Sequence, residues 1–300
     1  MTSKKLPQTT KYGSLWMLVA ALSFATMGAL VKVGSAKFSS AELVFYRSLF
    51  GLLIILTLIR VKHLPIKTPH LHKQLARSLI GFAALLMFFY AISHLPLATA
   101  ITLNYTSPLF LAALMPFMLH ERPKKVLYLA VLISFIGILL LLKPSFARAD
   151  LLAGIVGLCS GIGAGLAYLH VKQLGNLHEP DWRTVFYFTL ISTIGAGIWM
   201  LFDQVSVVTW HDLPILLGLA GSATLAQLAL TRAYRTGKTL TVASLSYATV
   251  VISSLFGILF WAEHLSASEW LAIGLIMIGG VLSTYSAQQA EPIVAENADH

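Results

Sequence analysis

The chain has little charge and almost no cysteine. Only 11% of its 300 residues are charged, whereas 57% are hydrophobic. An average soluble domain carries roughly 25% charged residues, so this composition excludes an ordinary water-soluble domain and indicates a chain that lies mainly in lipid. Cys159 is the single cysteine, which excludes an intramolecular disulfide and a metal centre built from several cysteines.

Acidic residues are also scarce, and none lies in the middle of an apolar run. The 12 Asp and Glu residues lie near the ends of these runs or in the polar segments between them. The chain therefore lacks the buried acid on which many proton-coupled transporters depend. Uniport, coupling through groups at helix ends, and movement of charge with the substrate all stay open.

Ten apolar runs follow one another along the chain, with charged or proline-rich connections between them. A helix of about 20 residues crosses the roughly 30 Å core of a bilayer. We therefore expect an all-α integral membrane fold with ten transmembrane helices. The expected spans are 13–33, 43–59, 75–93, 97–119, 126–142, 152–171, 184–202, 213–234, 240–262 and 268–286.

Basic residues collect in alternate connections. Most of the Lys and Arg residues, Arg77 and Lys172 among them, are assigned to connections on one side of the membrane, and few to the other. Because positive residues stay on the cytoplasmic side, both termini are predicted to be cytoplasmic. The net charge of +9 is thus explained by membrane orientation, and no nucleic-acid partner is expected.

The second half of the sequence repeats the first. Three residues of the first half recur at nearly constant spacing: Lys32 as Lys172, Tyr105 as Tyr247, and Glu121 as Glu263. Each half holds five expected helices, an odd number, so the second half enters the membrane from the opposite side. Inverted repeats are typical of secondary transporters that work by alternating access. The expected organisation is a cytoplasmic tail 1–12, a first repeat 13–143, a second repeat 152–286 and a cytoplasmic tail 287–300.

Several short motifs occur together with this repeat. They are a lysine-ended first helix at 29–32, the segment 42–47 that opens the second helix, a Tyr-x-x-Pro helix at Tyr105 and Pro108, and the helix-ending Glu121 and Glu263. Over residues 13–286 the combination resembles the EamA family of the drug/metabolite transporter superfamily. The second repeat departs from the first at one point, because Phe188 stands where the first repeat has Arg47.

The resemblance implies ten helices around a central cavity and a multi-pass protein of the bacterial inner membrane. It further implies transport of amino acids, their derivatives, cofactors or toxic metabolites, with export favoured. The alternatives are an integral-membrane enzyme or a channel without a transport cycle. No catalytic residue, metal or cofactor is expected. The expected partners are a small-molecule substrate and membrane lipids, and both a monomer and a homodimer stay open.

Arg47 is the clearest candidate for a functional residue. An arginine at the centre of a membrane helix costs about 2.5 to 3.5 kcal/mol on insertion scales, so it needs a reason to be there. In a structural interpretation Arg47 bonds to backbone carbonyls or to Glu42 at the helix end. In a functional interpretation it anchors a carboxylate of the substrate.

Polar side chains form matching belts near the middle of expected spans 97–119 and 240–262. Such residues either contact the substrate or bond neighbouring helices, as Ser, Thr and Asn often do in membrane bundles. The candidate substrate-binding residues are Arg47, Asn104, Tyr105, Ser107, Tyr168, Gln227, Ser246 and Tyr247. Gating or structural roles are assigned to Lys32, Pro108, Glu121, Lys172 and Glu263.

Glycines are frequent in span 152–171. Gly157, Gly161 and Gly165 recur at a spacing of four, which favours close helix packing or a flexible gating helix. A phosphate-binding loop is excluded, because the Lys and Ser/Thr that such a loop requires do not follow Gly165.

Overall fold

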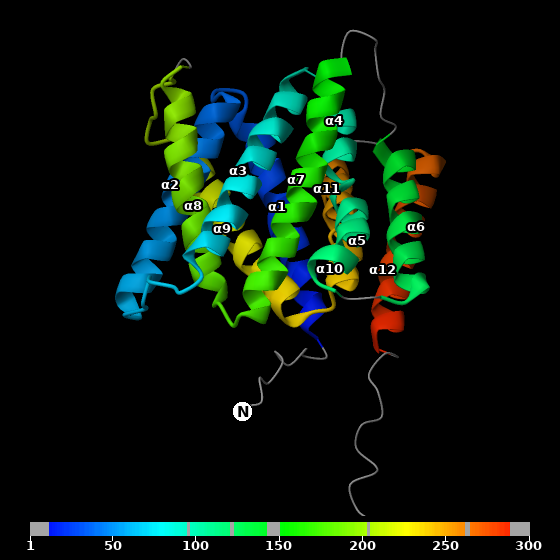
Figure 1. Cartoon of the computed structure of the whole chain (residues 1–300). Coiled ribbons are helices and arrows are strands. Elements are labelled where there is room, and N and C mark those ends of the chain that lie inside the picture. Colours follow the sequence, from blue (N-terminus) through cyan, green and yellow to red (C-terminus); the bar gives the residue numbers. More distant parts are fainter. Residues whose placement is uncertain are drawn as a thin grey trace, which may run out of the picture.

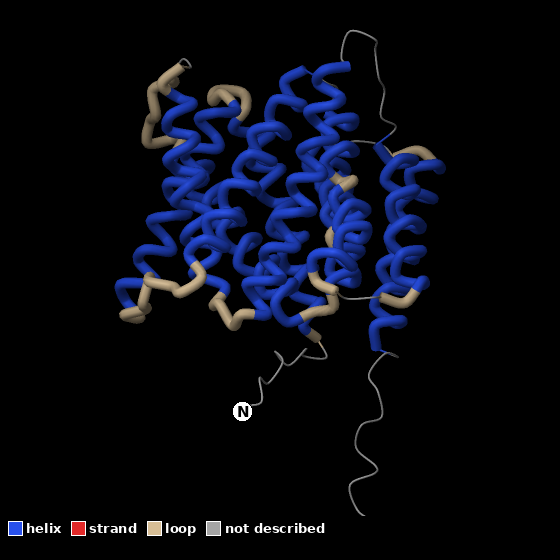
Figure 2. Tube along the Cα trace, viewed as in Figure 1, coloured by secondary structure: helices blue, strands red, loops and turns tan. Residues whose placement is uncertain are grey.

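A computed structural model describes the chain over residues 12–94, 97–120, 123–142, 151–202, 205–261 and 265–288. Within these ranges the protein is all-helical, and loops join the helices at the two ends of one bundle (Figure 2). We call these ends the Trp16 end, where α1 begins, and the Gly34 end, where α1 finishes. Both described termini lie at the Trp16 end, which is the lower end in Figure 1.

The bundle begins with a short 3-10 helix, η1 (Gly13–Leu15). The first half then comprises α1 (Trp16–Gly34), α2 (Ser40–Val61), α3 (Leu71–His94), α4 (Leu97–Asn104), α5 (Ser107–Met118) and α6 (Lys125–Leu142). The second half comprises α7 (Leu151–Asn176), α8 (Asp181–Met200), α9 (Leu213–Thr236), α10 (Thr239–Leu245), α11 (Ala248–Trp261) and α12 (Ala267–Gln288).

The structure supports a membrane protein but gives fewer unambiguous spans than the sequence predicts. Seven segments of the described chain are long and apolar enough to cross a membrane, counting α4 with α5 and α10 with α11. The apolar stretches Lys125–Leu140 of α6 and Ala267–Ser283 of α12 are shorter, and α8 is not among the seven. Side chains such as Leu22, Leu259 and Leu271 are exposed on the outside of the bundle, as expected for a surface in contact with lipid.

Two of the expected spans are each divided into two helices. The breaks fall at matching places, beside Tyr105 between α4 and α5 and at Tyr247 between α10 and α11. At each break one backbone amide bonds three residues back, Thr106 to Leu103 and Tyr247 to Ser244. This is the tighter turn of a 3-10 helix. The two halves therefore share an interrupted helix that the apolar pattern alone does not predict.

The helices pack in pairs that reflect an inverted repeat. α1 packs against α9, and the equivalent pair with the halves exchanged, α7 and α3, packs in the same way. α2 packs against α8, and α6 against α12, so each of these pairs joins a helix to its own counterpart. α1 starts at the Trp16 end whereas α7 starts at the Gly34 end (Figure 1). Contacts between the halves thus make up much of the interior.

Carboxylates tie the two halves together at the Gly34 end. Glu42, near the start of α2, accepts hydrogen bonds from the backbone N–H groups of Ser39 (2.7 Å) and Ser206 (2.6 Å), and Ser206 lies in the connection between α8 and α9. Asp212, before α9, pairs with Lys37. Hydrogen bonds, above all that from Lys37, lower the pKa of the Asp212 carboxyl to about 2.

A comparable set of contacts lies at the Trp16 end. Glu179, in the turn between α7 and α8, accepts hydrogen bonds from Thr68, from Gln74 (3.2 Å) and from Arg183 (2.8 Å). Burial raises the pKa of the Glu179 carboxyl, but these hydrogen bonds hold it below its ordinary value. The acidic groups in the described residues therefore form hydrogen bonds and ion pairs at the ends of the bundle, where the sequence predicts them to lie.

Candidate substrate site

Arg77 is buried inside the bundle, which corrects its assignment to a surface connection. α3 begins at Leu71, so Arg77 lies well inside the helix, and only 2% of its surface is exposed. Its Nη2 donates to Oε1 of Gln227 on α9 (3.2 Å), and its guanidinium lies 4.0 Å from the centre of the Phe188 ring on α8. Nε and Nη1 are buried without a hydrogen-bond partner.

Room for the Arg77 side chain depends on a glycine one turn further along α3. A methyl group at Gly81 would lie 3.2 Å from Nη1 of Arg77 and 3.3 Å from the Phe188 ring. Both distances are tighter than ordinary carbon contacts, so a larger residue would displace the guanidinium or the ring. The sequence therefore leaves space for a buried cation at this point.

Arg47 on α2 is the second buried arginine, with 8% of its surface exposed. The structural interpretation that pairs it with Glu42 is wrong, because the Glu42 carboxylate bonds Ser39 and Ser206 instead. Arg47 makes no hydrogen bond or ion pair with another residue of the described ranges. It interacts electrostatically with Arg77, and both arginines interact with the hydroxyl of Tyr168 on α7.

Tyr168 is linked to three further tyrosines of the interior, Tyr105, Tyr234 and Tyr247. The rings of Tyr105 and Tyr247 meet with their centroids 6.1 Å apart, so the two repeat-related residues touch where the halves join. The rings of Tyr168 and Tyr234 stack at 5.4 Å. Tyr105 also interacts electrostatically with Tyr168, and Tyr234 with Tyr247. We call the following residues the central polar cluster: Arg47, Arg77, Tyr105, Tyr168, Gln227, Tyr234 and Tyr247.

The remaining predicted site residues lie in the helix breaks, where several bond other helices or the backbone. Asn104 donates to Ser160 Oγ on α7 (3.2 Å), and Ser246 donates to the carbonyl of Ala243 (2.7 Å). Ser107 is buried, and Pro108 stands in the first turn of α5. For Asn104 and Ser246 the structure thus provides the interhelical or local bonding that was the alternative to substrate contact.

The glycines of α7 allow close packing, as predicted. A methyl group at Gly161 would lie 2.5 Å from the carbonyl oxygen of Leu103, and one at Gly165 would lie 2.9 Å from that of Ser107. Both carbonyls flank the break between α4 and α5. By contrast, a methyl group at Gly154 would meet nothing within 4 Å. α7 therefore approaches the broken helix through two of its glycines.

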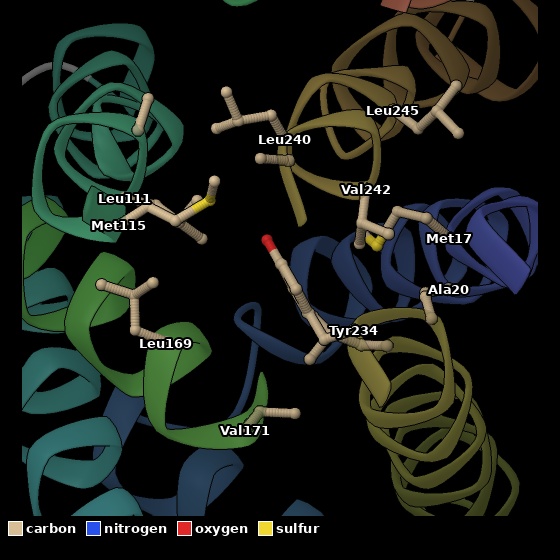
Figure 3. Packing of buried hydrophobic residues seen from close by; sticks show 14 of the residues in the cluster. Met17, Ala20, Leu111, Met115, Leu169, Val171, Tyr234, Leu240, Val242 and Leu245 are labelled. Carbon is tan, nitrogen blue, oxygen red and sulfur yellow. The ribbon is translucent and has the colours of Figure 1, made fainter. Parts of the chain in front are cut away.

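The Trp16 end is closed by an apolar cluster that joins both halves. Figure 3 shows the Tyr234 ring extending from α9 toward Leu111 and Met115 of α5 and Leu240 of α10. Lys172 is only 5% exposed and donates to the carbonyl of Gly237 (3.1 Å), which fastens α7 to the connection after α9. Lys172 is thus inside α7, which extends to Asn176, and not in a surface connection.

At the Gly34 end carboxylates join the halves, but the helix contact equivalent to that of α7 with α9 is missing among the residues that the structure describes. α7 packs against α9, but their counterparts α1 and α3 make no comparable contact. Lys32, the counterpart of Lys172, is exposed. Glu121 and Glu263, the other residues given gating or structural roles, lie outside the described ranges.

The sequence alone does not identify three residues of the site: Arg77, Tyr234 and Phe188. Arg77 follows a basic connection and is easily counted with it, although the expected span 75–93 already contains it. Tyr234 stands at the last position of its expected span, beside Arg235, and carries no distinguishing signal. Phe188 is noticed only as the residue that replaces an arginine, and its contact with Arg77 follows from the fold. Among the described residues no group of three or more His, Cys, Asp or Glu side chains could hold a metal ion.

The sequence model of the EamA-like transporter family matches this chain twice, over residues 11–143 and 151–285. The chain belongs to the EamA-like transporter family. The resemblance inferred from its motifs is therefore confirmed. A solved crystal structure has the same fold, with a TM-score of 0.82 over 93% of this chain and 99% of that one, at 18% sequence identity.

Relatives of this EamA-like chain include proteins that are named as transporters. It is 34% identical over 272 residues to the pseudopaline exporter CntI of Pseudomonas aeruginosa, which covers 91% of this chain and 93% of that one. It is 30% identical over 282 residues to an uncharacterized transporter of Helicobacter pylori (91% and 95%) and 24% identical over 263 residues to the riboflavin transporter of Brucella anthropi (86% and 91%). Family and relatives agree on membrane transport.

Proposed function

We propose that the protein is a secondary transporter that moves a small metabolite across the bacterial inner membrane by alternating access. Its ten spans form two inverted repeats, residues 13–143 and 152–286, and the central polar cluster lies on the substrate path between them. In this cycle the two halves rock against each other, so that the site opens to one side at a time.

The observation that carries this proposal is the unequal closure of the two ends. In an inverted repeat, each contact at one end has a counterpart at the other, and the two sets form in turn during the cycle. The Lys172–Gly237 bond and the α7–α9 contact close the Trp16 end, whereas α1 and α3, the counterparts of α7 and α9, make no comparable contact at the Gly34 end. The conformation is that of a transporter closed on one side.

The Trp16 end is assigned to the cytoplasm and the Gly34 end to the periplasm. Lys62 and Lys67, in the connection after α2, and Lys238, in the connection after α9, lie at the Trp16 end, in agreement with the preference of Lys and Arg for the cytoplasmic side. Both termini are then cytoplasmic, and the site is open to the outside. Export is the favoured direction, in line with the exporter among the relatives.

The test is transport by protein reconstituted in vesicles, with substrates first identified by metabolite profiling of cells with and without the chain. Gln227→Ala removes the bond to Arg77, and Tyr105→Phe removes a hydroxyl beside the helix break. Both should reduce transport about tenfold or more, as expected when a polar partner in a site is lost, while the melting temperature in detergent stays close to that of the wild type. Unchanged rates in both variants would remove the central polar cluster from the transport path.

A labelling experiment tests the membrane orientation separately. In a Cys159→Ser background, Lys37→Cys at the Gly34 end should react with a membrane-impermeant maleimide in intact cells. Val61→Cys at the exposed Trp16 end should react only after the membrane is permeabilised. Reaction of both cysteines from the same side would reject the proposed topology.

A further inference from the structure

Two positive charges lie in the central polar cluster, and the described chain supplies no negative charge to balance them. Arg77 is 2% exposed and Arg47 is 8% exposed, and the two interact electrostatically with each other. An unpaired charge removed from water costs several kcal/mol, so buried cations are normally paired. The lack of a negatively charged partner for these two arginines therefore needs an explanation.

Every carboxylate in the described ranges is engaged elsewhere. The partners are Ser39 and Ser206 for Glu42, Arg183 for Glu179, Arg235 for Asp181, Lys37 for Asp212, and Ser266 for Glu269. All of these pairs lie at the ends of helices. No described acid therefore faces the two arginines in the interior.

The guanidinium of Arg77 is held in place but keeps donors free. Gln227 and the Phe188 ring fix its orientation, and neither carries a negative charge. Nε and Nη1 of Arg77 remain buried with no hydrogen-bond partner. Arg47, with 8% of its surface exposed, makes no hydrogen bond or ion pair with a described residue. Planar guanidinium groups with free N–H donors suit carboxylate or phosphate oxygens, because charge-assisted bonds of this kind are short and strong. The arrangement is oriented for an anion that the described residues do not supply.

We propose that the central polar cluster binds a small organic dianion, whose two negative charges are balanced by Arg47 and Arg77. This inference rests on the proposed transport function and adds the chemical class of the substrate. Tyr168 interacts with both arginines, and its ring stacks on that of Tyr234, so an aromatic pair extends from the charges. The substrate thus completes the ion pairs that the described residues do not form.

The binding test uses thermal melting of the full-length protein in detergent at constant ionic strength. The probes share one skeleton and differ in charge: succinate with two carboxylates, succinamate with one, and neutral succinamide. Glycerol phosphate represents the phosphate dianions. A dianion at a concentration well above its dissociation constant should raise the melting temperature by about 4 °C. Succinamate should raise it less, and succinamide should leave it unchanged.

Variants of the arginines show whether the shift comes from this site. In Arg47→Gln and Arg77→Gln the difference between dianion and neutral probe should vanish. Arg60→Gln is the matched control, because it removes the same charge from an exposed position on the same helix as Arg47 and should leave the difference intact. A shift from glycerol phosphate alone would support the dianion and assign it to the phosphate class. Equal effects of all probes, no effect of any dianion, or a dianion effect that survives both substitutions would overturn the proposal.

The stability of the empty protein distinguishes a binding role from a structural one. If the role of Arg47 is to bind an anion, Arg47→Gln removes an unpaired buried charge, and the protein without ligand should melt at the same or a higher temperature. A fall of more than about 5 °C would show that Arg47 holds the fold together and would overturn the proposal. Uptake of succinate into vesicles is measured separately. Binding without uptake would reject transport and keep the dianion site, whereas transport that needs neither arginine would keep transport and reject the site.

Discussion

The two halves of the molecule share a scaffold but differ in chemistry at equivalent positions. Arg47 in the first half corresponds to Phe188 in the second, and the structure places the Phe188 ring against the other buried arginine, Arg77. One half therefore supplies the cations, and the other supplies the ring and the Gln227 amide that hold one of them. The repeat determines where side chains lie, whereas the differences between its copies determine what the site can bind.

The first helices of the two halves differ in a similar way. Aligning Lys32 with Lys172 places Ala21 and Ala25 of α1 opposite Gly161 and Gly165 of α7. Both alanines are buried, so α1 packs with a methyl group where α7 has none. α7 lies closer to its broken helix, α4 and α5, than an alanine would permit. The half with the closer approach is also the one whose lysine is buried at the closed end.

The largest effect is expected from Gly161→Ala, which gives α7 the residue that α1 has at this point. The added methyl group would lie 2.5 Å from the Leu103 carbonyl oxygen, and backbone on both sides prevents easy relief. Overpacking of this kind costs about 3 kcal/mol, so the melting temperature should fall by several degrees. Gly154→Ala, on the same helix with free space around it, is the control and should have no such effect. Equal behaviour of the two variants would show that α7 can shift away from α4 and α5.

An intermediate effect is expected from Lys172→Met, compared with Lys32→Met. Loss of the bond to the Gly237 carbonyl should weaken the closure of the Trp16 end, because a hydrogen bond from a charged group contributes about 1.5 kcal/mol or more. In a Cys159→Ser background, the rate at which Met115→Cys reacts with a soluble maleimide should rise about tenfold. Lys32→Met removes an exposed side chain from the open end and should change that rate by less than about twofold. If both substitutions raise the rate equally, the two ends are not closed by different contacts.

The smallest effect is expected from Pro108→Ala. The second half breaks its helix at the matching place with Val250 at the position of this proline, so the break does not require a proline. Pro108 also stands in the first turn of α5, where a missing N–H removes no helical hydrogen bond. The cost in unfolding free energy should stay below about 1 kcal/mol, as measured by denaturation in detergent, and transport should persist. A loss several times larger would mean that proline creates the break in the first half only.

Much of the fold could be predicted from the sequence, because apolar run length and repeat spacing report directly on helices in lipid. The expected span 213–234, for example, lies within α9 and misses only its last turn. The breaks beside Tyr105 and Tyr247 could not be predicted, because an apolar run with a few polar residues has the same composition whether or not its helix is continuous. Only backbone geometry distinguishes the two.

The candidate site was predicted in part for a similar reason. Arg47, Gln227 and Tyr168 stand out as polar or aromatic groups in apolar spans, and the structure brings them together. Arg77 was missed because it follows a basic connection and was counted with it, although the expected span 75–93 and α3 both contain it. The role of Phe188 depends on a contact between α8 and α3 that no local pattern encodes.

The meeting of Tyr105 and Tyr247 has a consequence for how far a cargo must travel. These residues are repeat partners, and their rings touch where the halves join. In the alternating-access cycle that we propose, the pivot between the two halves is displaced least, so a substrate bound beside this pair would keep nearly the same depth in the membrane. The side of the membrane to which the site opens would change, while the substrate stays near the pivot between the halves.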